Sequence, residues 1–106
     1  YYIDDIMPLF ENQFDFILDL NLNCFEILKD CLQLEINVTK TKIFEKDPDQ
    51  VTDLRNLVNR NYKTETLSPY TQVFTDKYGF ITNLSILDLL FNEGPNTELY
   101  LQKQKL

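Results

Sequence analysis

Four polar residues of this sequence have types and positions that could do chemistry: Tyr70, Gln72, Asp88 and Asn92. Asp88 lies inside the most apolar run of the chain, residues 86–91. A carboxylate held in an apolar pocket is a typical acid–base group, so Asp88 is the predicted catalytic residue. The alternative is structural, because an acid in the first turn of a helix also interacts favourably with the helix dipole.

The other three residues are predicted to bind a substrate. Asn92 falls one helical turn after Asp88 and would share its face. Tyr70 can donate a hydrogen bond to a sugar or phosphate oxygen, and Gln72 lies beside it on an irregular segment of the kind that often carries sites. Each has a structural alternative: a helix C-cap for Asn92, a buried anchor for Tyr70, and an amide that satisfies backbone groups for Gln72.

The residue types that are missing exclude several catalytic classes. The chain has no histidine, so it holds no Ser-His-Asp or Cys-His arrangement of its own. Cys24 and Cys31 are the only thiols, and along one helix they would be about 10.5 Å apart, too far for a disulfide. We predict two buried free thiols, as in a reducing compartment, and no metal site, because two thiolates alone are too few ligands. The sequence identifies no cofactor.

The formal net charge of −7 is concentrated at the N-terminal end, where residues 1–34 hold seven acids and one base. A solvated acidic face is the simplest interpretation. A negative field argues against nucleic acid or an anionic membrane as a partner. The sequence shows no signal peptide and no apolar run long enough to span a membrane, which favours a cytoplasmic protein.

The most clearly delimited element is a helix expected over residues 85–93. Ser85 is a good N-cap, and Asp88 occupies the capping-box position three residues later. Gly94 suits the left-handed residue after a helix, and Pro95 prevents its continuation. Apolar residues cover most of the circumference, so we expect this helix to be buried on nearly all sides.

A long helix is expected over residues 14–32, with one apolar face that the helix 85–93 should contact. That face repeats at three- and four-residue steps and includes Leu20, Cys24, Ile27 and Cys31. Before it, Asp5 can cap a short helix from Ile6 to about Asn12. After Pro95, residues 96–106 are weakly helical and are expected to fray.

Residues 35–44 predict one strand, because they are rich in β-branched residues and Lys40 and Lys42 alternate along them. A lone strand is not stable, so a segment near residues 70–75, another molecule or a further part of the protein should pair with it. Residues 47–58 begin like a helix but have a thin apolar stripe, so helix and loop both stay open. Residues 59–68 are typical of a mobile loop, and Gly79 should have a positive φ in a turn.

The expected fold is therefore mainly α: three or four helices around the buried helix 85–93, with one or two short strands. A chain of 106 residues forms one domain. It begins without Met, and we expect it to be part of a larger protein. Tyr1, Tyr2 and Ile3 and one side of the strand would then lack their cover, so self-association into a homo-oligomer is expected.

Two stretches carry a family resemblance. The run FITNLSILDLLFNEGP, preceded by SPYTQVF, resembles the C-terminal signature of the WbqC-like protein family, which also has Tyr, Gln, Val and Phe at the positions of Tyr70, Gln72, Val73 and Phe74. The helix with its inner DLNLN, followed by VTKTKIF, is similar to an earlier segment of those proteins. The resemblance covers most of this chain and corresponds to the C-terminal part of the family.

The resemblance implies a cytoplasmic bacterial protein of surface-polysaccharide (O-antigen) biosynthesis. It implies a glycine transferase or another acyl- or glycosyl-type transferase that acts on an activated sugar or aminoacyl donor, within a larger α/β protein of which this chain is the helical end. The alternative from the residues alone is a non-catalytic helical scaffold or protein-interaction domain.

Overall fold

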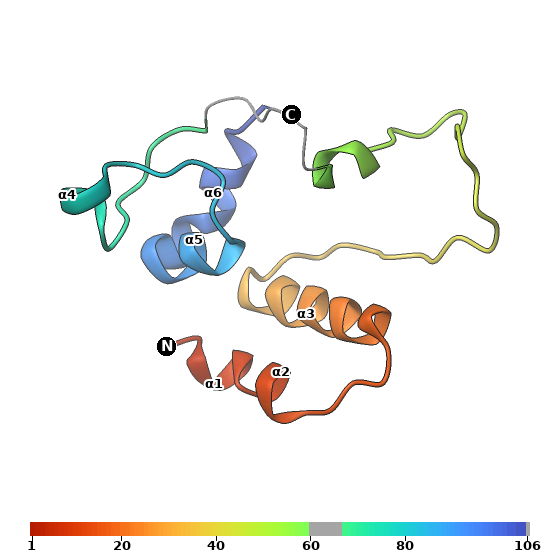
Figure 1. The fold of residues 1–106 in the computed structure, drawn as a ribbon, viewed down its shortest axis with the longest axis horizontal. Helices are drawn as coiled ribbons and strands as arrows, with labels where there is room; N and C mark the ends of the chain where they lie inside the picture. Colours follow the sequence, from red (N-terminus) through yellow and green to blue (C-terminus); the bar gives the residue numbers. More distant parts are fainter. Residues whose placement is uncertain (60–66, 106) are drawn as a thin grey trace.

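The computed structural model describes residues 1–59 and 67–105 (Figure 1). They contain two groups of helices, and the first group is followed by a long loop, residues 33–54. The N-terminal group consists of helices α1 (Ile3–Ile6), α2 (Pro8–Glu11) and α3 (Ile17–Cys31). Helix α1 contacts α2, and both contact α3. Ile6 is the buried residue of this group, with 2% of its surface exposed.

The predicted short helix from Ile6 to Asn12 is instead two single turns. Asp5 lies inside α1 and does not cap a helix. Helix α2 starts at Pro8, where the missing N–H costs nothing. The residue between the two turns, Met7, keeps helical dihedral angles. The chain can therefore continue from one turn into the next without a side-chain cap.

Helix α3 confirms the predicted long helix, although it begins at Ile17 after an extended Phe16. It ends with Gln33 at φ 54° and a hydrogen bond from the amide of Leu34 to the carbonyl of Lys29, which is a Schellman-type end. No residue of α3 is buried. Cys24 and Cys31 are free, as predicted, but half-buried and not enclosed. The core that was expected to cover this helix is absent along most of its length.

The C-terminal group consists of α4 (Thr75–Tyr78), α5 (Ile86–Glu93), the 3₁₀ turn η2 (Gly94–Asn96) and α6 (Thr97–Gln102). Ser85 caps α5 as predicted: its side-chain oxygen accepts a 3.2 Å hydrogen bond from the amide of Leu87. Gly94 follows α5 with φ 53°, also as predicted. Pro95, however, leads directly into η2 and α6, and α6 packs back on α5.

The prediction that the helix 85–93 is buried on nearly all sides is wrong. Leu89 and Leu90 are buried, at 5% and 0% exposure, whereas Phe91 is 51% exposed. Helix α5 packs against η2 and α6, and α3 is not among the elements in contact with it. The physical reason is proximity, because a three-residue turn brings α6 onto α5 at little entropic cost while α3 lies beyond the long loop.

The one or two predicted strands are absent from the described residues. Residues 35–44 make no backbone hydrogen bonds with the rest of the described chain and are exposed. A strand is stable only when paired, and the expected partner region around 70–75 forms instead a loop that enters α4. The described part of the fold is therefore helical and lacks the strands that the β-rich composition of residues 35–44 predicted.

Arg55 fixes the far end of the long loop. Its guanidinium group donates hydrogen bonds to the backbone carbonyls of Glu45 and Lys46 and to the carboxylate of Asp53, and it lies 5.4 Å from the centre of the Phe44 ring. The bond to Arg55 lowers the pKa of Asp53 to about 2. Residues 47–58 are consequently loop apart from a 3₁₀ turn, η1 (Arg55–Val58).

The predicted mobile loop 59–68 lies mostly outside the described residues. The two residues at its end, Leu67 and Ser68, are attached to the C-terminal group. The amide of Ser68 donates to the side chain of Gln104 at 3.1 Å, and its carbonyl accepts from the Tyr100 hydroxyl at 2.6 Å. Helix α6 and Gln104 are thereby held in place, which corrects the expectation of a fraying tail for the described residues 96–105; Leu106 lies outside them.

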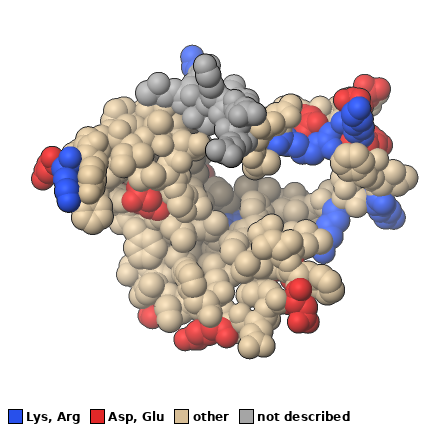
Figure 2. Space-filling model, in the orientation of Figure 1, with Lys and Arg blue, Asp and Glu red and all other residues tan. Residues whose placement is uncertain are grey.

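The structure is open for its length. The radius of gyration is 16.0 Å, against about 13 Å for a compact domain of 100 residues. The accessible surface is 9543 Å², about half as much again as the roughly 6,200 Å² of a compact monomer of this mass. In Figure 2, Lys and Arg gather mainly over the long loop, while acids alone mark the lower surface over α1–α3.

Leu90 should be the most sensitive core position. Leu90→Ala removes a fully buried side chain and should lower the free energy of unfolding by about 2–5 kcal/mol, through lost transfer energy and the cavity left behind. Urea titration followed by circular dichroism measures the change. Phe91→Ala is the matched control on the same helix. Its ring is half exposed and touches Tyr2 edge-on, so the loss should be about 1 kcal/mol. Equal losses at the two positions would show that α5 is not buried along the Leu90 side.

Candidate functional site

Three of the four predicted site residues meet on one side of α5. The Tyr70 hydroxyl donates a 2.6 Å hydrogen bond to Oδ2 of Asp88. The Asn92 side-chain amide donates to Oδ1 of Asp88 at 3.3 Å and to the Asp88 backbone carbonyl at 2.7 Å. The Asp88 carboxylate therefore binds Tyr70 and Asn92, and does not make the capping-box bond to Ser85 that the sequence suggested.

Aromatic rings hold Tyr70 in this position. Its ring packs edge-on against Phe80 and Tyr100, with centroid distances of 5.4 and 5.3 Å. Burial, reinforced by the hydrogen bond to Asp88, raises the pKa of Tyr70. The phenol is therefore protonated at neutral pH and acts as a hydrogen-bond donor to the carboxylate.

Gln72 lies close to this group but uses its amide differently. The side chain is 6% exposed, its Nε2 donates to the Ile81 carbonyl at 2.7 Å, and its Oε1 accepts from the Ile81 amide at 2.9 Å. This pair of bonds closes the loop that contains α4, in the way a neighbouring strand would. These bonds are the ones expected from the structural alternative, in which the Gln72 amide satisfies backbone groups. A role of Gln72 in substrate binding stays a prediction.

A small hollow of about 310 Å³ lies beside Asp88 and Gln72. This volume is at the lower end of the range for small-molecule sites. Its other walls come from the loop around α4 and from the segment before α5: Val73, Phe74, Tyr78, Gly79, Ile81 and Leu84. Gly79 has φ 69°, as the sequence predicted, and its turn forms one edge of the hollow.

The arrangement can bind a small polar group more readily than it can bind a metal. The carboxylate of Asp88 keeps acceptor capacity beyond its bonds to Tyr70 and Asn92, and it borders the hollow. Among the described residues, no group of three or more Cys, Asp or Glu side chains is placed to hold a metal ion. A sugar hydroxyl or an ammonium group that donates to Asp88 would suit these walls.

Sequence reasoning missed two residues of α6 that support the site. Tyr100 packs on Tyr70, and burial, with the nearby charge of Glu93, raises its pKa. Thr97 is fully buried, and its hydroxyl has no hydrogen-bond partner among the described residues. The spacing of Thr97 and Tyr100 by one helical turn is the signal that could have indicated a packed face in the tail.

The comparisons with known proteins identify no relative. The chain matches no protein-family model, no curated protein and no solved structure. The resemblance to WbqC-like proteins and the roles assigned to Tyr70, Gln72, Asp88 and Asn92 therefore stay predictions. In the part of the chain that the structure describes, no helix is long and apolar enough to cross a membrane.

Burial of the Tyr70 phenol, together with its hydrogen bond to Asp88, should be visible in the pH dependence of stability. Because the folded protein has a raised Tyr70 pKa, the stabilising contribution is complete below the unfolded value of about 10 and is lost as the pH rises through the folded value. Unfolding by urea at a series of pH values from neutral to alkaline should show this decline.

The decline should be shallower in Tyr70→Phe, which has no phenol at that position to ionise. Tyr78→Phe is the control, because Tyr78 is 61% exposed and makes no hydrogen bond to Asp88. An equal alkaline decline in wild type and Tyr70→Phe would contradict the assignment.

Proposed function

We propose that this chain is a helical protein-interaction domain that serves bacterial surface-polysaccharide biosynthesis in the cytoplasm. The large exposed surface supports the first part of this proposal, that the chain is a protein-interaction domain. A chain that keeps about 9543 Å² accessible has apolar area that a compact monomer would bury. The polysaccharide context rests on the resemblance to WbqC-like proteins.

The apolar start of α3, formed by Phe16, Ile17 and Leu18, is the proposed contact surface. These three consecutive residues are 69%, 72% and 58% exposed. Several exposed apolar side chains close together on a folded protein indicate an interaction site more often than an isolated one does. A second copy of the chain is the proposed first partner, because one patch on two identical subunits can form a closed two-fold contact.

Sedimentation velocity over a range of protein concentrations tests this proposal. We expect the wild type to associate, and Ile17→Ser to weaken the association by about a hundredfold, because roughly 1.5 kcal/mol of apolar burial is lost from each of the two subunits. Val58→Ser is the control: Val58 is 90% exposed but lies on η1, away from α3. A wild type that stays monomeric at high concentration would contradict the proposal, as would equal effects of the two substitutions.

A transferase is the second candidate function, because Asp88 borders a hollow and is held by Tyr70 and Asn92. In this hypothesis Asp88 is the acid–base catalyst. Tyr70, Gln72 and Asn92 bind an activated sugar or aminoacyl donor, and the product is a glycine-, acyl- or glycosyl-modified polysaccharide precursor.

Thermal-shift assays with nucleotide-sugars and an aminoacyl donor test the transferase. Binding in the hollow should raise the melting temperature of the wild type, and Asp88→Asn should abolish turnover. Gly79 gives a local readout, because its amide lies at the edge of the hollow and should shift in a ¹⁵N–¹H spectrum. No thermal shift and no change at Gly79 with any donor would remove the transferase hypothesis and leave the interaction domain.

A further inference from the structure

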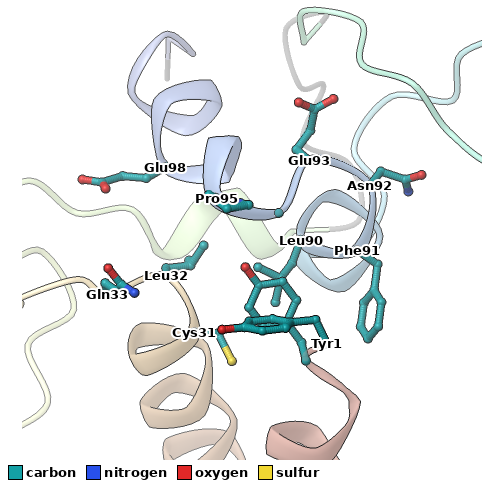
Figure 3. Close-up of a pocket in the computed structure, with 12 residues that line it drawn as sticks. Tyr1, Cys31, Leu32, Gln33, Leu90, Phe91, Asn92, Glu93, Pro95 and Glu98 are labelled. Atoms are coloured by element: carbon teal, nitrogen blue, oxygen red, sulfur yellow. The ribbon is translucent and has the colours of Figure 1, made fainter.

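A larger hollow lies where the N-terminal and C-terminal helical groups meet (Figure 3). Its volume is about 630 Å³, in the middle of the range for small-molecule sites. A second hollow of about 260 Å³ shares four of its lining residues, and the two neighbouring hollows are together called the junction groove here. The shared residues are Tyr1, Tyr2, Cys31 and Gln33.

Aromatic rings form one wall of the junction groove. Tyr2 packs perpendicular to Tyr1, with centroids 5.0 Å apart, and nearly perpendicular to Phe91, at 6.3 Å. Figure 3 shows Tyr1 between Cys31 at the end of α3 and Phe91 on α5. The face of an aromatic ring attracts a cation.

The charged side chains of the junction groove are all acidic. Glu98 of α6 borders the larger hollow, and Asp5 and Asp30 border the smaller one; no Lys or Arg side chain lines either. Asp5 and Asp30 lie close enough to the Cys31 thiol that, after burial, their charges help raise its pKa. Acidic side chains therefore line both hollows, and the aromatic residues Tyr1 and Tyr2 are common to the two.

Glu93 also borders the larger hollow but belongs to another environment. Figure 3 shows its carboxylate directed away from Tyr1. Its charge helps raise the pKa of Tyr100, which packs on Tyr70 away from the groove. Glu93 thus has the same charge as Glu98 but comes from α5, and its charge acts on Tyr100.

We propose that the junction groove binds a linear aliphatic polyamine. One ammonium group lies near Glu98 and another near Asp5 and Asp30, while the methylene chain crosses the Tyr2 and Phe91 rings. A single metal ion does not fit the same charges, because no three such side chains among the described residues converge on one point. The net charge of −7 also favours cations near the protein.

Titration of ¹⁵N-labelled protein with spermidine tests the proposal. The chain has two glycines, whose amide signals fall in a separate region of the spectrum. Gly94 borders the junction groove and Gly79 borders the hollow beside Asp88. We expect the Gly94 signal to shift in a saturable way and the Gly79 signal to stay in place.

Three substitutions that each remove one negative charge distinguish binding in the junction groove from general attraction of a cation to an acidic protein. Glu98→Gln and Asp30→Asn should each weaken spermidine binding by about twofold to fivefold, toward the upper end of the range expected for ion pairs at partly exposed sites. Glu93→Gln should leave it within twofold. Hexane-1,6-diol, which has a similar chain and no charge, should not shift Gly94.

Three results would overturn the proposal. Equal weakening by all three substitutions would show diffuse attraction to an acidic protein. A Gly94 shift produced equally by Mg²⁺ at matched charge would show that neither the chain nor the rings contribute. Absence of any saturable Gly94 shift with spermidine would show that the groove does not bind a polyamine.

Discussion

The packing of α6 on α5 is the contact on which the C-terminal half of the molecule depends. It buries Leu90 and Thr97 completely, and it requires the chain to reverse within η2. Gly94 makes the reversal possible, because its φ of 53° is strained for any residue with a side chain, even though a Cβ there would meet no other atom within 4 Å. Once α6 is in place, Tyr100 contacts Tyr70 and binds the Ser68 carbonyl. Tyr70 is thereby brought to Asp88, so the candidate site depends on a turn outside it.

Local signals predicted the parts of this structure that are decided locally. The Ser85 cap, the left-handed glycines at 79 and 94 and the central turns of α3 each follow from a few neighbouring residues. The predictions that were wrong concern which segments of the chain pack against each other. Among the described residues, 35–44 have strand composition but no pairing segment. The apolar circumference of α5 suggested burial on all sides, although only Leu89 and Leu90 of this helix are buried. The composition of a segment indicates the apolar surface that it could bury. Which other segment covers that surface depends on the path of the rest of the chain.

The contacts of the candidate site were also predictable only where they join residues close together in the sequence. Asn92 follows Asp88 by one helical turn, and their contact is a property of the helix. Tyr70 is 18 residues from Asp88, and nothing in the spacing indicates that its hydroxyl reaches the carboxylate. Thr97 and Tyr100 were assigned to a fraying tail because the weak helical pattern after Pro95 does not show that the tail packs against the preceding helix.

The long loop between the helical groups has a consequence for how the chain folds. Each group is built from elements that are neighbours in sequence, α1 to α3 on one side and α5 to α6 on the other. Contacts of this kind need only small loops to close, so each group can form early and independently of the other. The edge-on contact of Tyr2 with Phe91 joins residues near opposite ends of the chain, and it can form only after both groups exist. We therefore expect the two groups to dock after each has formed.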